Sequence, residues 1–198
     1  MRARIRGLME QQAVAPLLEA TLEYIQANPD SGWGWLVSAP TLIDLGRYDD
    51  AKAALKKARK LTGKGAHPSI CYWRCILHKE RGELAKAQKH IEKAIELEPR
   101  SGAFRVTLGD LLARRGKLKA AIKVLKSAIA LGDSAGEDSV AADIDLEEAY
   151  FNLALVHRAQ RRYRDALVAA DKALGIDPNY AAAQALKNDL EAVLQGGW

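Results

Sequence analysis

Four segments of the sequence align with one another without a gap, and this repeat constrains the fold more than any other feature. The segments are LGRYDDAKAALKKARKL (45–61), RGELAKAQKHIEKAIEL (81–97), RGKLKAAIKVLKSAIAL (115–131) and QRRYRDALVAADKALGI (160–176). Their first residues lie 36, 34 and 45 positions apart. A period near 34 residues is typical of helical hairpins that stack on one another. The self-similarity therefore predicts an array of helix pairs.

The residue types that recur suit a tight turn followed by a closely packed helix. The aligned positions are Gly46, Gly82, Gly116 and Arg161; Tyr48, Leu84, Leu118 and Tyr163; Ala51, Ala87, Ala121 and Ala166; and Ala58, Ala94, Ala128 and Ala173. Glycine can adopt a positive φ in the turn without penalty. Paired alanines let the second helix approach the first closely. Two of the second helices are expected to end at Glu98-Pro99 and Asp177-Pro178, because proline cannot continue a helix.

A first helix precedes each turn, with equally regular spacing. Leu108-Gly109 and Leu153-Ala154 supply a large–small pair, and the preceding aligned slot is held by Trp35, Cys71, Arg105 and Tyr150. With these residues the chain resembles the tetratricopeptide repeat (TPR) family, whose units carry a Trp, Leu-Gly, Tyr, Gly, Ala, Ala, Pro framework. The resemblance covers about residues 32–180, and it implies an all-α, right-handed superhelical solenoid of antiparallel helix pairs.

The resemblance also implies the boundaries of the repeats. We expect a degenerate helical repeat or cap at 1–31, four units within 32–178 at about 32–65, 68–101, 102–135 and 147–180, and a C-terminal capping helix with a tail at 179–198. The acidic insertion 132–146, GDSAGEDSVAADIDL, separates the last two units. It lacks the spacing of a calcium loop. We interpret it as a solvated loop whose Asp145 and Glu148 cap the next helix; a contact or regulatory loop is the alternative.

Composition agrees with a helical protein and sets limits on its environment. The chain is 48% hydrophobic, 28% charged and only 6% aromatic, with a formal charge of +5, and Ala, Leu, Lys and Glu favour helices. No apolar run approaches the roughly 18 residues that cross a bilayer. Two cysteines form no disulfide framework. We therefore expect a cytoplasmic, stand-alone TPR protein without a membrane span.

No motif for catalysis is present, so we predict that the chain is not an enzyme and has no cofactor, catalytic residue or metal site. A phosphate-binding GxxxxGK[ST] loop, HExxH and paired CxxC are all absent from the sequence. CYWRCILH (71–78) puts Cys71, Cys75 and His78 on one helical face, which could begin a soft-metal or redox site. The repeat register instead makes all three framework residues, and we favour that interpretation over metal or redox chemistry.

Three smaller expectations concern single residues. His67 and His90 are expected to face solvent and to bind nothing. Pro40 lies inside the first helix of the first unit, where it should kink or break the helix.

The family resemblance implies that the first helices line a concave groove that binds a ligand. In that register the expected partner-binding residues are Trp33, Leu36, Tyr72, Ile76, Lys79, Val106, Asp110, Arg114, Phe151, Leu155 and Arg158. They would form an apolar band with a basic edge, and an exposed apolar patch usually marks a binding site. The co-chaperone type of the family grips a carboxylate with Lys and Asn where this chain has Leu36 and Pro40, so that mode is not expected here.

We therefore predict a non-catalytic adaptor or scaffold that binds an acidic-flanked amphipathic helix or extended peptide of a partner protein. Two other occupants of the groove remain open: the chain's own N-terminal segment, and a second copy in a homodimer. The alternative function is a nucleic-acid-associated or self-assembling structural subunit. It draws on the basic balance and on the residues Arg114, Arg115, Arg158, Arg161, Arg162 and Arg164.

Overall fold

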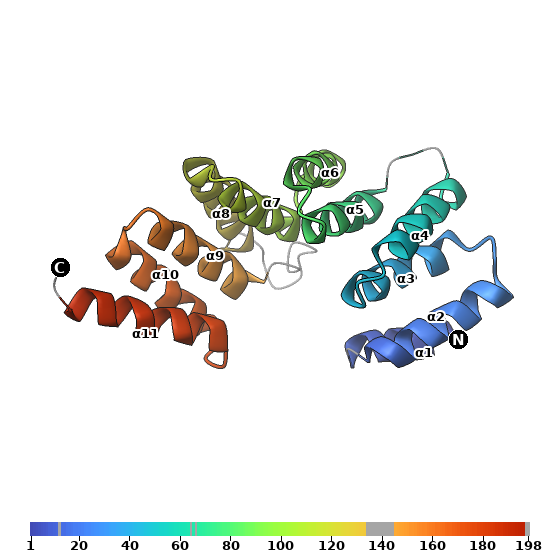
Figure 1. Ribbon diagram of the computed structural model, residues 1–198, viewed down its shortest axis with the longest axis horizontal. Coiled ribbons are helices and arrows are strands. Elements are labelled where there is room, and N and C mark those ends of the chain that lie inside the picture. Colours follow the sequence, from blue (N-terminus) through green and yellow to red (C-terminus); the bar gives the residue numbers. More distant parts are fainter. Residues whose placement is uncertain (12, 64, 66, 134–144, 197–198) are drawn as a thin grey trace. The chain divides into compact units, whose positions relative to one another are not determined.

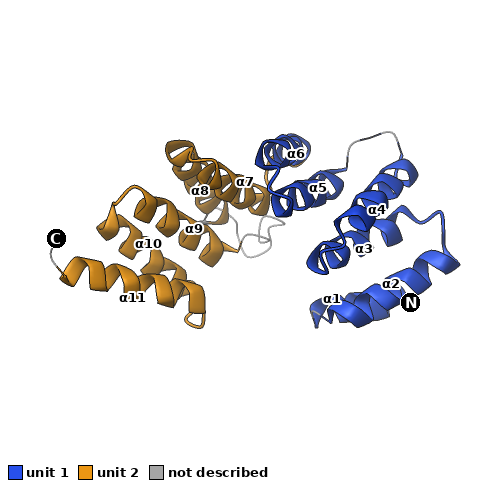
Figure 2. Ribbon diagram, viewed as in Figure 1, with its two compact units in different colours: residues 1–97 blue, residues 98–198 orange. Residues whose placement is uncertain are grey.

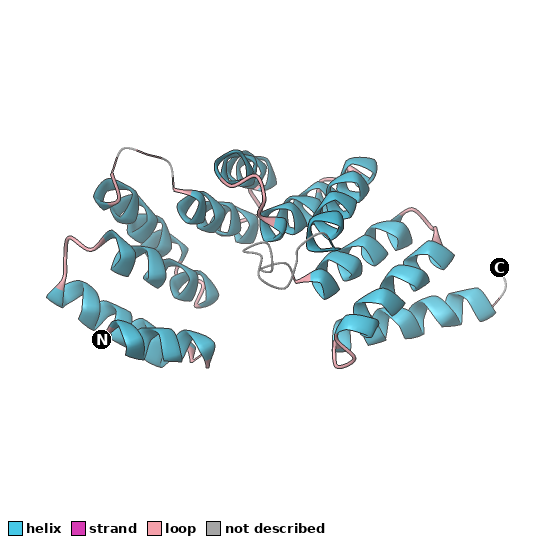
Figure 3. Ribbon diagram, turned by 180° about the vertical axis from the view of Figure 1, so that it is seen from behind, coloured by secondary structure: helices cyan, strands magenta, loops and turns pink. Residues whose placement is uncertain are grey.

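The computed structural model describes residues 1–11, 13–63, 65, 67–133 and 145–196. Helices are the only regular secondary structure in these residues (Figure 3). Their bounds are α1 Arg2–Glu10, α2 Val14–Ala27, α3 Gly32–Asp44, α4 Tyr48–Leu61, α5 Pro68–Glu80, α6 Leu84–Leu97, α7 Gly102–Arg114, α8 Leu118–Asp133, α9 Leu146–Ala159, α10 Tyr163–Ile176 and α11 Ala181–Gln195 (Figure 1). The all-α class predicted from the repeat is thus confirmed.

The chain divides into two compact units, Met1–Leu97 and Glu98–Trp198 (Figure 2). In the first unit α3 pairs with α4 and α5 with α6, while α2 packs against α3 and α1 packs against α2. In the second unit α7 pairs with α8 and α9 with α10, and α11 packs on α10. Among the described residues, each unit therefore contains two successive helix pairs of the predicted kind, with two further helices, α1 and α2, in the first unit and one, α11, in the second.

Small residues on the second helices let the two helices of a pair pack closely. Ala51, Ala58, Ala87 and Ala94 are all fully buried. The first helix of the α7–α8 pair makes the same close approach, since a Cβ added at Gly109 would lie 2.6 Å from Leu125. The predicted role of these framework residues is confirmed by their burial.

The turns inside the pairs share a left-handed residue. Gly46, Gly82 and Gly116 have φ values of 69°, 72° and 73°, and Arg161 has φ 58° in the corresponding turn between α9 and α10. The N–H of Gly46 donates to the carbonyl of Ile43 at 2.9 Å, and Arg161 donates to Arg158 at 2.9 Å in the same way. Because a Cβ crowds the backbone in this conformation, Arg161 holds a strained position that glycine fills elsewhere.

The structure bears on three expectations for single residues, and it contradicts the one for His90. Helix α3 does not break at Pro40 but continues to Asp44; a kink at Pro40 stays a prediction. His90 does not face solvent: it is half-buried and stacks on His78 with ring centroids 5.2 Å apart. Asp145 is the N-cap residue of α9, although its side chain makes no capping hydrogen bond. Residues 134–144 of the acidic insertion lie outside the described part of the chain.

His157 is a buried polar residue on α9. It is only 6% exposed, and its Nδ1 has no hydrogen-bond partner among the described residues. Burial is the main cause that lowers the pKa of His157 below its usual value, and the charge of Arg162 acts in the same direction. The fold therefore favours the neutral imidazole.

We expect alanine to be less stable than glycine, by a similar free energy of unfolding, at position 116 and at position 161. Gly116→Ala should lower the free energy of unfolding by about 1 kcal/mol, because alanine resists the left-handed conformation. At position 161, the Gly variant should be more stable than the Ala variant by a similar amount of about 1 kcal/mol, since both variants lose the same charge. Denaturant unfolding measures both differences. Equal stability of the two variants at 161 would show that no strain is present there.

Acid should destabilise the protein in part through His157. Its pKa is lowered by folding, so its contribution to stability is present above the unfolded value of 6.5 and is lost as the pH falls towards the folded value. His157→Leu, with the residue type found at the aligned positions 42 and 112, should show a smaller loss of unfolding free energy between about pH 7 and pH 5. The exposed residue His67, replaced by Leu, is the control. An unchanged pH profile in His157→Leu would contradict this assignment.

Candidate functional site

Five of the expected partner-binding residues lie on two neighbouring helices of the first unit. Trp33 and Leu36 are on α3, and Tyr72, Ile76 and Lys79 are on α5, which packs against α3. All five side chains are partly exposed. We call this set the α3–α5 surface. It combines four apolar or aromatic residues with one cation.

The N-terminal helices already contact one end of the α3–α5 surface. The Trp33 ring packs edge-on against Tyr24, with centroids 5.1 Å apart, and the guanidinium of Arg2 lies 5.0 Å from the Trp33 ring centroid. The Nε of Arg2 also donates to the Tyr24 hydroxyl at 2.7 Å. Such cation–π and aromatic contacts hold α1 and α2 against α3. Trp33 is thus engaged within the chain, and Leu36 of α3 with Tyr72, Ile76 and Lys79 of α5 forms the rest of the surface.

An aromatic residue that the sequence analysis did not select adds to this surface. Trp73 is partly exposed, packs against the core of the first unit and lies edge-on to Tyr72, with ring centroids 5.0 Å apart. Its position falls outside the ligand-facing slots of the repeat register. The signal that could have found it is the adjacent Tyr72-Trp73 pair, because aromatic residues are favoured at the centres of interfaces.

The other six expected residues lie on α7 and α9 of the second unit, which pack against each other. They are Val106, Asp110, Arg114, Phe151, Leu155 and Arg158. Val106 is only 4% exposed and belongs to the core, because α7 packs against both α8 and α9. Its expected place on an exposed band is therefore corrected. We call the remaining five residues the α7–α9 surface.

Several residues of the α7–α9 surface have partners within the unit. Arg114 Nε donates to Asp110 Oδ1 at 2.8 Å, and Arg158 lies 4.0 Å from Asp189 of α11. Phe151 packs against Tyr180, with centroids 5.0 Å apart. Leu155 is partly exposed and packs against the same core cluster as Phe151. Surface ion pairs of this kind are weak, so a partner could exchange for them at little cost.

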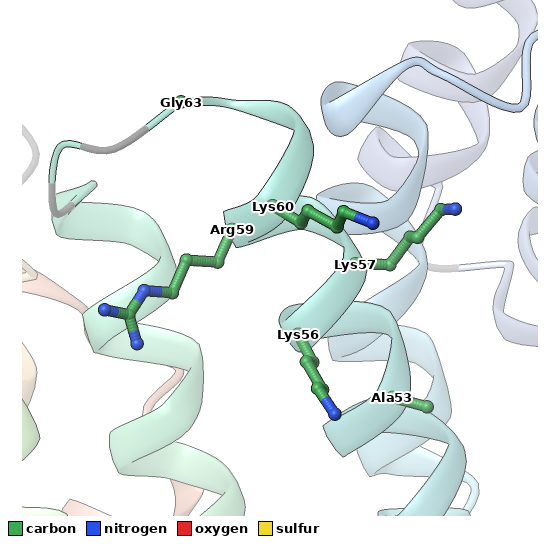
Figure 4. Close-up of a pocket in the computed structure, with 6 residues that line it drawn as sticks. All are labelled: Ala53, Lys56, Lys57, Arg59, Lys60 and Gly63. Carbon is green, nitrogen blue, oxygen red and sulfur yellow. The ribbon is translucent and has the colours of Figure 1, made fainter.

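The sequence analysis also missed a basic cavity on α4 (Figure 4). The cavity has a volume of about 690 Å³ and is lined by Ala53, Lys56, Lys57, Arg59, Lys60 and Gly63. Figure 4 shows Lys57 and Lys60 extending to one side of the helix and Arg59 to the other. The sequence signal was the run KKARK at 56–60, which lies inside the first aligned repeat segment (45–61). Four cations on two turns favour acidic ligands.

A metal or redox site at CYWRCILH (71–78) was the alternative to framework positions for these residues. In the part of the chain that the structure describes, no group of three or more His, Cys, Asp and Glu side chains is placed to hold a metal ion. Cys71 and Cys75 are buried and form no disulfide among the described residues, in keeping with framework positions. Burial raises the pKa of the Cys71 thiol, which disfavours the reactive thiolate. Among the described helices, none is both long enough and apolar enough to span a membrane.

Comparison with known proteins agrees with the repeat framework. Tetratricopeptide repeat models match residues 35–63, 76–136 and 147–180. A TPR repeat-containing protein of Methanocaldococcus jannaschii is 27% identical over 106 residues, which is 54% of this chain and 18% of that protein. The chain spans between 6% and 27% of the length of the curated relatives with which we compared it.

Two solved structures show the same fold at low identity. A thermophilic TPR protein of Thermus thermophilus superposes with a TM-score of 0.77 at 18% identity, covering 95% of each chain. YrrB, a TPR protein with an unusual peptide-binding site, superposes with a TM-score of 0.61 at 17% identity, covering 93% of this chain and 88% of its own. The three repeat matches, the buried alanine framework and this common fold lead to one conclusion: the chain belongs to the tetratricopeptide repeat family, whose members generally mediate protein–protein interactions.

Proposed function

We propose that this chain is a non-catalytic adaptor whose α3–α5 surface binds a peptide or helix of a partner protein, with the α7–α9 surface as a second contact. The observation that carries the proposal is the group Leu36, Tyr72, Trp73 and Ile76, which are all partly exposed on two neighbouring helices. Aromatic and aliphatic side chains that remain accessible together are the usual anchors of an interface. Most of the other large apolar side chains of α3 and α5 are buried in the core.

The charges beside these residues favour an acidic-flanked ligand. Lys79 is the cation of the α3–α5 surface. Arg114 and Arg158 are the cations of the α7–α9 surface, and more than two-fifths of each arginine side chain is exposed. An amphipathic helix or extended segment with an apolar stripe and acidic flanks complements this pattern. YrrB, which shares the fold, has a peptide-binding site, and this supports a peptide as the ligand class. Two cysteines that form no disulfide suit a reducing compartment such as the cytoplasm.

Peptides selected from a display library on the wild-type chain should share an apolar stripe with acidic flanks. Tyr72→Asp should weaken their binding about tenfold or more, because a buried aromatic anchor contributes about 2 kcal/mol. Phe151→Asp tests the second surface in the same way. Val168→Asp is the matched control, since Val168 is an apolar residue of α10 that is 59% exposed and lies outside both surfaces. Fluorescence anisotropy measures affinity, and circular dichroism verifies that each variant is folded.

The alternatives give different results in the same set of variants. Unchanged affinity in both Tyr72→Asp and Phe151→Asp would contradict the proposal. A concentration-dependent mass in sedimentation that Tyr72→Asp abolishes would instead identify a second copy as the occupant. Tight binding of nucleic acid with a steep loss at high salt would favour the nucleic-acid alternative.

A further inference from the structure

A second cavity of the first unit lies between α4, α5 and α6 and has a volume of about 250 Å³. Besides two leucines, it is lined by Lys52 and Lys56 from α4, Arg74 and His78 from α5, and His90 from α6. Helix residues two positions apart are separated by about 200° of rotation. Arg74 therefore lies on the opposite face of α5 from Tyr72 and Ile76, and this cavity is separate from the α3–α5 surface.

Arg74 is an unusual residue for its place in the fold. The guanidinium is half-buried, and no hydrogen bond or ion pair joins it to an acid among the described residues. Burial, followed by the charge of Arg59, lowers its pKa. A partly buried cation without a partner is unfavourable. Its aligned positions in the second unit are held by Leu108 and Leu153, so the helix pair does not need a charge here in order to pack.

The corresponding cavity of the second unit provides an internal comparison. It lies between α8, α9 and α10, has a volume of about 200 Å³ and is lined by Leu153 and Ala169, among others. These two residues align with Arg74 and His90. Asp165 also lines that cavity, whereas no acid of the described chain lines the cavity beside Arg74. The cavity at this place in the helix pairs is thus lined by cations in the first unit and by both cations and an acid in the second.

The two histidines complete the wall of the first cavity. Nδ1 of His78 donates to Glu83 Oε2 at 2.6 Å, and the His78 ring lies parallel to His90, with an interplanar angle of 5°. Glu83 also accepts from Lys86 at 3.1 Å. Burial is the main cause that lowers the pKa of His90, with His78 and Arg74 acting in the same direction. An anion among these groups would reverse the effect of those neighbouring charges on His90.

We propose that the cavity between α4, α5 and α6 binds a phosphate group, either as free phosphate or as a small phosphate monoester. A guanidinium fork with two ammonium groups and an imidazole N–H matches the several acceptor oxygens and the charge of a phosphate dianion. The volume of the cavity is large enough for a phosphate group or a small phosphate monoester. Bound phosphate gives Arg74 the counter-charge that the described residues do not provide.

The test is titration of the protein with inorganic phosphate, measured by calorimetry and by the NMR signals of the His90 ring. Wild type should bind saturably, and the pKa of His90 should rise, because an anion then joins Lys52, Lys56, Arg74, His78 and Glu83 around it. Arg74→Leu should weaken binding about tenfold or more, the usual effect of losing a charged hydrogen-bond partner. Arg74→Lys should lie between the two, because it keeps the charge but loses the fork. Glycerol phosphate in a parallel titration shows whether the free ion or the monoester binds more tightly.

Lys57→Gln is the matched control, because Lys57 lies on α4 but lines only the larger basic cavity. It should change the affinity for phosphate less than about twofold, as expected for a distant surface charge. The proposal is overturned if wild type does not bind saturably, or if sodium chloride at equal ionic strength produces the same His90 shift. It is also overturned if Lys57→Gln weakens binding as much as Arg74→Leu does. Unchanged phosphate binding in a folded Arg74→Leu variant would also overturn the proposal.

Discussion

Close approach between the two helices of each pair is the interaction on which the rest of this structure depends. Alanine occupies the inner face of every second helix in the repeat, and Ala51, Ala87, Ala121 and Ala166 are all fully buried. Short side chains bring the helix axes together, so that large residues such as Leu55 and Leu125 fill the core between them. A three-residue turn with one left-handed residue is then enough to connect the pair.

This packing leaves particular faces of the first helices accessible. Helix α5 shows the division clearly: Cys71, Cys75 and Leu77 are buried, while Tyr72 and Ile76 remain partly exposed. A residue whose burial the fold does not require is available for binding, and aromatic side chains there contribute most. The protein-binding proposal follows from this division of one helix into a packed side and an open side.

Departures from the framework identify the positions where packing alone does not explain the residue. Arg161 replaces the turn glycine, His157 replaces a leucine and leaves Nδ1 without a partner in the described residues, and Arg74 replaces a leucine beside a cavity. Each of these has an unfavourable physical consequence for the folded state. Arg74 differs from the other two because lysines and histidines line the same cavity, and this is the site where we propose that phosphate binds.

Structural properties set by neighbouring residues in the sequence were predictable, whereas those set by contacts between distant helices were not. Helix pairs, turn positions and the small-residue framework were predictable, because a period near 34 residues repeats the same local geometry four times. The exposure of individual residues was less so: Val106 proved buried, Trp33 was contacted by Arg2, and His90 was covered by its stacking on His78. These outcomes depend on which neighbouring helix lies over a residue, and a repeat register does not contain that information.

The sequence by itself therefore determined the family and the all-helical architecture, since regular spacing of Gly, Ala and Leu allows one kind of packing. Tertiary structure alone decided which side chains meet. It placed Trp73 beside Tyr72, and it brought Lys52, Arg74 and His90 from three helices to one cavity. The physical reason is that charge and accessibility at a point are sums over groups distant along the chain, and only packing brings those groups within reach of one another.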